Sequence, residues 1–169
     1  MTEPLFPAAP LTIDPRTVLD PLATDDRQWG ARLVGMEPWR TLGATADGLR
    51  RYLVRPDPAL ARYRILREAH EAGVVTIRHP WLAGPFVELL AIAEPFRRMG
   101  LGRAVMRGII SRSAATNRNL WVSVSASNPA ALAFYRHLGF GELAVMPDLL
   151  QPGHGEILLR LHPLPGPAA

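Results

Sequence analysis

The sequence of 169 residues contains no cysteine and no lysine. Without cysteine, the chain can form no disulfide scaffold, no thiolate zinc site and no covalent intermediate on a thiol. Without lysine, Schiff-base chemistry and the lysine of a phosphate-binding P-loop are both excluded. The missing cysteines fit a reducing compartment, and we predict a cytoplasmic protein without a metal site.

All 19 basic residues are therefore arginines, against 15 acidic residues, which gives a formal net charge of +4. The planar guanidinium group suits polyphosphate recognition because it binds phosphate oxygens with two bonds. Coding bias is the alternative explanation for this composition. The arginines are scattered singly or in pairs, without the basic tracts typical of nucleic-acid-binding proteins, so we expect no nucleic-acid partner.

Little in the sequence points to a membrane. The start, Met1 to Pro4, has neither a basic nor an apolar stretch and predicts no secretory peptide. The longest uncharged run, Asn119 to Tyr135, contains two asparagines, three serines and a proline, which argues against a transmembrane helix. The length predicts one domain over residues 1–169, and the clustered prolines predict an irregular N-terminal segment over 1–21 and a C-terminal tail over 163–169.

Hydrophobic periodicity predicts helices that alternate with strands. Helices are expected within 25–42, over 45–53, from Leu101 to Ile109, and from Pro129 to a stop at Gly139. Strands are expected over 59–67, 74–78, 86–93, 120–125, 142–146 and 156–161. We expect a turn at 71–73 and a hairpin around Pro152-Gly153. This order predicts an α/β (α+β) fold with a mixed sheet flanked by helices.

The most informative stretch is Arg97-Arg98-Met99-Gly100-Leu101-Gly102-Arg103, between a buried strand and an amphipathic helix. Its glycines let backbone N–H groups approach an anion where the helix begins, and a pyrophosphate is the expected guest. The alternative is a glycine-containing turn with solvated arginines. The dinucleotide-binding pattern fails because Val105 stands where its third glycine would be.

This stretch resembles the R-x-x-G-x-G signature of the GNAT superfamily of acetyl-CoA-dependent N-acetyltransferases, although Glu94-Pro95 departs from the family's usual order after the strand. The resemblance covers residues 86–140 well and 37–160 more loosely. It implies a single domain with a twisted, mostly antiparallel sheet that is splayed between strands 86–93 and 120–125. It also implies acetyl-CoA as co-substrate, bound by strand backbone and by the glycine loop. The residues implied in this binding are Leu90, Ala91, Ile92, Arg97, Arg98, Met99, Gly100, Leu101, Gly102 and Arg103.

The segment from Asn128 to Phe140 is similar to the family's N-x-x-A-x-x-x-Y-x-x-x-G-F block. The resemblance implies that Asn128 contacts the pantetheine arm and that Phe134 also borders the cofactor. Tyr135 would lie near the thioester sulfur and protonate the leaving thiolate, for which a phenol with an ordinary pKa of about 10 is suited. The alternative is that Asn128 is only a helix cap and Tyr135 only a core aromatic residue.

A general base is less sharply marked. Glu88 is the one charge in the strand 86–93, and apolar surroundings raise a carboxyl pKa toward useful values. A paired or edge-exposed charge is the alternative, as is deprotonation through water. The resemblance implies that Trp39, Glu88 and His154 border the acceptor, with Glu156 nearby; turn chemistry for His154 and helix anchoring for Trp39 are the alternatives.

The resulting hypothesis is acetyl transfer from acetyl-CoA to a primary amine by direct attack. A non-catalytic acyl-CoA-binding sensor or interaction domain is the alternative, for which Tyr135 would be dispensable. The expected acceptor is a small-molecule amine or a peptide or protein amine, and the sequence does not choose among them. We expect a monomer or homodimer that binds no membrane.

Overall fold

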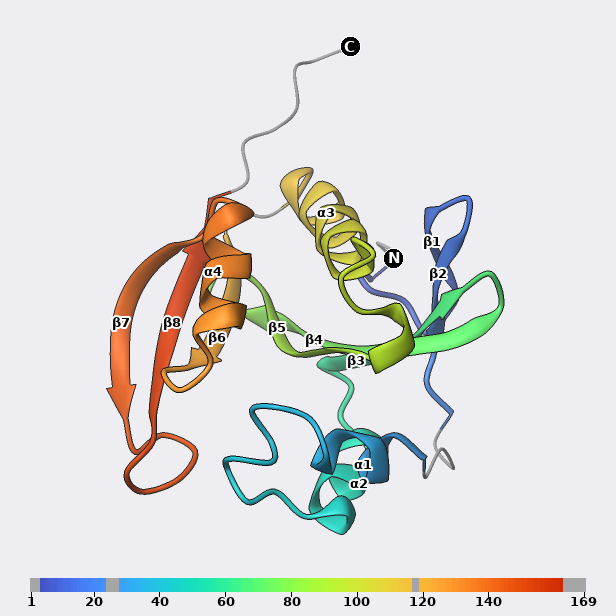
Figure 1. Ribbon diagram of the computed structural model, residues 1–169. Helices are drawn as coiled ribbons and strands as arrows, with labels where there is room; N and C mark the ends of the chain where they lie inside the picture. Colours follow the sequence, from blue (N-terminus) through green and yellow to red (C-terminus); the bar gives the residue numbers. More distant parts are fainter. Residues whose placement is uncertain (1–3, 24–27, 117–118, 163–169) are drawn as a thin grey trace. The chain divides into compact units, whose positions relative to one another are not determined.

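The computed structural model describes residues 4–23, 28–116 and 119–162, in which eight strands and four α-helices occur (Figure 1). The contacts within the chain divide these residues into two compact units. The first holds 4–22, 58–116, 119, 120 and 162, and the second holds 23, 28–57 and 121–161. The strands are β1 (Leu11–Asp14), β2 (Thr17–Pro21), β3 (Leu60–Arg67), β4 (His70–Trp81), β5 (Gly84–Ile92), β6 (Leu120–Ser125), β7 (Gly141–Pro147) and β8 (Gly155–Leu161). The α-helices are α1 (Gln28–Val34), α2 (Ala46–Val54), α3 (Leu101–Ala114) and α4 (Pro129–His137).

Five strands of the first unit form an antiparallel meander in the order β1-β2-β3-β4-β5. The register places Val18 opposite Leu66 and Val75 opposite Leu90. Six consecutive residues of β4, from 72 to 77, are buried. Both faces of this strand are therefore covered, which explains its nearly continuous apolar sequence.

Residues 11–21 form a β-hairpin, so the irregular N-terminal segment predicted over residues 1–21 is wrong for this part. Pro15 lies in the turn, where the Asp14 carboxylate accepts a hydrogen bond from the Arg16 N–H at 2.8 Å. Pro10 and Pro21 stand at the outer ends of the two strands. Proline is tolerated in turns and at strand ends, so these prolines delimit the strands and do not prevent them. The predicted C-terminal tail lies outside the described residues.

The turn between β3 and β4 lies at Glu68 and Ala69, with φ of 51° and 66°, and not at the predicted 71–73. Gly73 lies inside β4, where a Cβ atom would come within 2.3 Å of the Ala91 carbonyl oxygen. Glycine is required there because the backbone of β5 passes so close, and not because the chain turns.

Helix α3 packs against β5 and β1 within the first unit. Its buried side chains include Leu101, Val105 and Ile109, at the helical spacing that the sequence predicts. At Gly108 a Cβ atom would lie 2.6 Å from Ile13 Cδ1, so a larger residue there would displace the end of the Ile13 side chain where the helix meets β1.

In the second unit the strand order is β6-β8-β7, and β7 pairs antiparallel with β8 around the predicted hairpin. Helices α1 and α2 pack together, with Trp29 and Leu33 fully buried. A Cβ atom at Gly30 would lie 2.7 Å from the Ala46 carbonyl oxygen, which shows how closely the helices approach.

These elements confirm the predicted class, a mixed α/β fold whose strand pairs are mostly antiparallel, with flanking helices. The predicted splay concerns β5 and β6, which belong to different units, so it stays a prediction. Within the described ranges, no helix has the length and apolar character needed to cross a membrane.

Candidate active site

The N-terminus of α3 presents backbone N–H groups that the helix itself does not use. Gly100 is the N-cap residue, in the left-handed conformation with φ of 76°, and no side chain caps the helix. The hydrogen-bonded ladder begins where the Ala104 N–H meets the Gly100 carbonyl oxygen at 3.0 Å. The N–H groups of Leu101, Gly102 and Arg103 come before it. A Cβ atom at Gly100 would meet nothing within 4 Å, so an anion can approach these groups closely.

The arginines around this terminus differ in what they contact. Arg97 Nε donates to the Ile92 carbonyl oxygen at 2.8 Å, and its guanidinium forms an ion pair with Glu94. Arg97 is exposed, as are Arg98 and Met99 of the loop and Arg103 in the first turn of α3. No ion pair among the described residues involves Arg98 or Arg103. These two can therefore meet an anion, whereas Arg97 holds the end of β5.

The backbone of β5 offers polar groups on the side away from β4. The Ala93 N–H bonds to the Ala72 carbonyl oxygen at 2.8 Å, and such bonds alternate along an antiparallel strand. The N–H and C=O groups of Leu90 and Ile92 are therefore directed away from β4, as cofactor binding by the strand would require. Ala91 faces β4 with its backbone, and its side chain is buried.

Glu88 on β5 is not isolated in apolar surroundings, as the sequence suggested. Arg78 of the neighbouring strand β4 forms an ion pair with the Glu88 carboxylate, and both side chains are largely buried. This is the paired charge that the sequence left open as the alternative. A role for Glu88 as general base stays a prediction.

Helix α4 carries the second half of the predicted site. Its N-cap Asn128 accepts a hydrogen bond from the Ala131 N–H at 3.1 Å through Oδ1, and among the described residues no hydrogen bond uses its Nδ2. Tyr135 is 7% exposed. Its ring packs edge-on against Phe134 and Phe140, with ring centroids 5.0 and 5.5 Å away. Asn128 is thus a cap and Tyr135 is packed in the core. The Asn128 Nδ2 and the Tyr135 hydroxyl are left for the cofactor contact and the proton transfer that the resemblance implies.

Burial raises the pKa of the Tyr135 phenol above its ordinary value. The hydroxyl therefore stays protonated throughout the neutral range. A protonated phenol can give a proton to a thiolate, which is the role that the sequence resemblance implies for it.

Two of the predicted acceptor residues, Trp39 and His154, lie on segments that meet in the second unit. Trp39 and His154 are both partly exposed. A Cβ atom at Gly43, shortly after Trp39, would lie 3.8 Å from Gln151 Nε2 in the β7–β8 turn. The turn is held by Asp148, whose N–H donates to the His154 carbonyl oxygen at 3.0 Å. The segments that carry Trp39 and His154 are therefore neighbours.

A buried carboxylate on β8 was missing from the predicted site residues. Glu156 is only 4% exposed, and its Oε1 has no hydrogen-bond partner among the described residues. The Ser123 hydroxyl of β6 bonds to the carboxylate, and burial raises the pKa of Glu156. The sequence marks it only as a carboxylate that opens an apolar run, a pattern that does not reveal burial.

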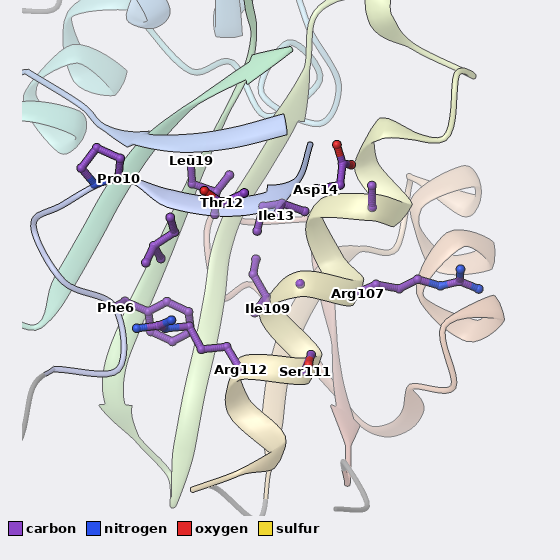
Figure 2. A pocket seen from close by; sticks show the side chains of 13 residues that line it. Phe6, Pro10, Thr12, Ile13, Asp14, Leu19, Arg107, Ile109, Ser111 and Arg112 are labelled. Atoms are coloured by element: carbon purple, nitrogen blue, oxygen red, sulfur yellow. The ribbon is translucent and has the colours of Figure 1, made fainter. Parts of the chain in front are cut away.

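A cavity of about 680 Å³ lies elsewhere in the first unit, between the N-terminal segment, β1 and α3 (Figure 2). Figure 2 shows Arg107 and Arg112 of α3 and Asp14 of β1 around it. None of the residues predicted to bind cofactor or acceptor lines this cavity.

Solved structures with the same fold are acetyltransferases. The ribosomal-protein-S18-alanine N-acetyltransferase from Escherichia coli superposes with a TM-score of 0.66 at 20% identity, covering 88% of this chain and 94% of that one. A ribosomal L7/L12 α-N-protein acetyltransferase in complex with coenzyme A gives a TM-score of 0.67 at 14% identity, covering 90% and 97%. At such identities the likeness establishes the fold.

The family follows from the sequence match. The Acetyltransferase (GNAT) family model matches residues 23–140, and the chain belongs to this family. Over 60 residues the chain is 42% identical to the [ribosomal protein bS18]-alanine N-acetyltransferase of Escherichia coli K12. That stretch is 33% of this chain and 38% of the relative, so the match spans well under half of the relative's length.

Proposed function

We propose that this chain is an N-acetyltransferase that transfers the acetyl group of acetyl-CoA to a primary amine by direct attack. The observation that carries the proposal is the N-terminus of α3, with its unused N–H groups beside an open, left-handed Gly100. The exposed Arg98 and Arg103 add positive charge that no carboxylate of the described residues neutralises. Such a donor set fits a diphosphate group, and family membership supports its assignment to coenzyme A.

The remaining cofactor contacts follow from the groups left available on β5 and α4. The outward backbone groups of Leu90 and the N–H of Ile92 would bond the amides of the pantetheine arm, since the Ile92 carbonyl oxygen already accepts from Arg97 Nε. The Asn128 Nδ2 would donate to the same arm while its Oδ1 continues to cap α4. Both contacts position the thioester and leave the reacting carbonyl free.

The chemical step needs no enzyme-bound acyl group, and the absence of cysteine excludes one on a thiol. The nitrogen lone pair of the amine bonds to the thioester carbonyl carbon, and the C–S bond breaks. The electron pair of that bond leaves on sulfur, the thiolate takes the proton of the Tyr135 hydroxyl, and a proton lost by the amine nitrogen restores that hydroxyl. The burial that keeps this phenol protonated supports the assignment.

For the acceptor, we propose the α-amine of a protein or peptide N-terminus. The support is the stretch of 42% identity to an enzyme named as an alanine N-acetyltransferase of ribosomal protein bS18. Trp39 and His154 would border this amine, since the segments that carry them meet. We further propose that residues 1–169 work as one acetyltransferase domain in the cytoplasm, because the family match draws on both compact units.

Isothermal titration with acetyl-CoA, followed by thiol release in the presence of a peptide with a free N-terminal alanine, tests this function. We expect saturable binding and thiol release that depends on the peptide. A peptide with a blocked N-terminus is the control. Failure to bind at millimolar acetyl-CoA contradicts the proposal, and binding without thiol release over a panel of amines favours a non-catalytic acyl-CoA-binding domain.

A further inference from the structure

Glu156 is buried between two neighbouring strands and is poorly satisfied there. It lies on β8 opposite Met146 of β7, with β6 on the other side. Its exposure is 4%, and among the described residues the Ser123 hydroxyl is the hydrogen-bond donor to its carboxylate. Oε1 is a buried oxygen without a partner in the part of the chain that the structure describes. A buried, ionised carboxylate with an unpaired oxygen costs free energy of folding, so packing alone does not explain a glutamate at this position.

Among the described residues, no positively charged side chain forms an ion pair with Glu156. Arg160, four residues along β8, places its guanidinium 5.9 Å from the centroid of the Trp121 ring. Glu142 of β7 pairs with Arg136 of α4. His154, two residues before Glu156, is held in the β7–β8 turn by backbone hydrogen bonds.

This condition sets Glu156 apart from Glu88, the carboxylate that the sequence suggested as general base. Glu88 already has Arg78 as its partner. Glu156 has an oxygen to spare and a nearby hydroxyl that steadies the other side of the carboxylate. An ammonium group has the charge and the donors to satisfy that oxygen.

We propose that Glu156 receives the proton of the acceptor's ammonium group before the amine attacks. This inference rests on the proposed acetyltransferase function and adds a residue to it. The ammonium donates to Oε1 and passes one proton to it, which leaves a neutral amine. That amine forms the C–N bond, and the C–S bond breaks as the thiolate takes the Tyr135 proton. The second nitrogen proton restores the tyrosine hydroxyl, and Glu156 releases its proton to water after the product leaves.

The test compares Glu156→Gln with Glu142→Gln, a matched change on the adjacent strand β7. Thiol release is measured with acetyl-CoA and a peptide with a free N-terminal alanine, over pH 5 to 9. We expect Glu156→Gln to lower kcat by about 100- to 10,000-fold, the usual contribution of a general base, with an unchanged acetyl-CoA Kd. Glu142→Gln should keep the wild-type rate.

The pH profile separates proton transfer from a structural role. Wild-type kcat/KM should rise with pH through the titration of Glu156. In Glu156→Gln the rate should instead follow the free amine, so its deficit should shrink as the pH approaches about 8, the ordinary pKa of an α-amine. Ser123→Ala removes a hydrogen bond that lowers the pKa of Glu156, so it should move the acidic limb to higher pH. If Glu156→Gln does not fold, the pH profile of Ser123→Ala tests the proposal in its place.

A wild-type rate in Glu156→Gln, or an acidic limb that neither variant moves, would overturn this inference while leaving the acetyltransferase function in place. A wild-type protein that releases no thiol would overturn both proposals.

Discussion

Replacing Gly100 by alanine distinguishes two roles of the α3 N-terminus: binding an anion and contributing to the stability of the fold. The substitution places a Cβ atom at a residue with φ of 76°, where no described atom beyond the neighbouring backbone lies within 4 Å. Left-handed backbone costs a non-glycine residue about 1–2 kcal/mol, and no steric clash with the protein adds to this. For a chain of this length, we expect Tm to fall by about 2–8 °C.

The effect on acetyl-CoA binding should be larger than the effect on stability. The new methyl group occupies the open space through which a phosphate would reach the N–H groups of α3. Losing one hydrogen bond to a charged group costs about 1.5–3 kcal/mol, which corresponds to an increase in Kd of roughly 10- to 150-fold.

Gly153 provides a matched control for this experiment. Its φ is 81°, and a Cβ atom there would also meet nothing within 4 Å, but it lies in the β7–β8 turn. Gly153→Ala should lower Tm by a similar amount and leave the acetyl-CoA Kd unchanged. Titration calorimetry and thermal unfolding measure both quantities. Equal Kd values for Gly100→Ala and the wild type would refute the assignment of this helix terminus to the phosphates.

Four further outcomes are expected. Tyr135→Phe should lower kcat by about 100- to 10,000-fold in thiol-release assays with little change in acetyl-CoA Kd, and an unaltered kcat where chemistry limits the rate would mean that another group is the acid. Arg98→Ala should do the opposite, weakening acetyl-CoA binding by about 1.5–3 kcal/mol in calorimetry. Gly73→Ala should destabilise the fold by about 1–3 kcal/mol in denaturant titrations, because its Cβ would press on backbone, whereas Gly35→Ala has room. The pKa of Glu156 is raised in the folded state, so the contribution of Glu156 to the free energy of unfolding falls as the pH rises above about 4.3. Glu156→Gln should lose this dependence when unfolding is measured as a function of pH.

Features that depend on local sequence were predictable. The asparagine cap and the proline that follow β6 place the start of α4 correctly, because capping and the fixed proline φ act within one helical turn. The glycines at the start of α3 are likewise a local signal, and in the structure Gly100 adopts the left-handed conformation that glycine favours.

Features that depend on pairing between distant segments were not predictable. The hairpin of β1 and β2 is fixed by its register with β3, for example Val18 opposite Leu66, and its prolines obscure it in the sequence. Arg78 reaches Glu88 only because β4 and β5 run antiparallel side by side. The burial of Glu156 depends in the same way on its neighbours in β6 and β7.

The central claim is acetyl transfer to an amine, and mass spectrometry of one peptide tests it most directly. The purified chain is incubated with acetyl-CoA and a peptide that has a free N-terminal alanine and one lysine, and fragmentation locates any acetyl group. The account predicts one acetyl group on the α-amine, only when both protein and acetyl-CoA are present. A peptide that stays unmodified beside folded, acetyl-CoA-bound protein would contradict the proposed N-terminal acceptor, and if a wider panel of amines also stayed unmodified it would contradict catalysis by this chain.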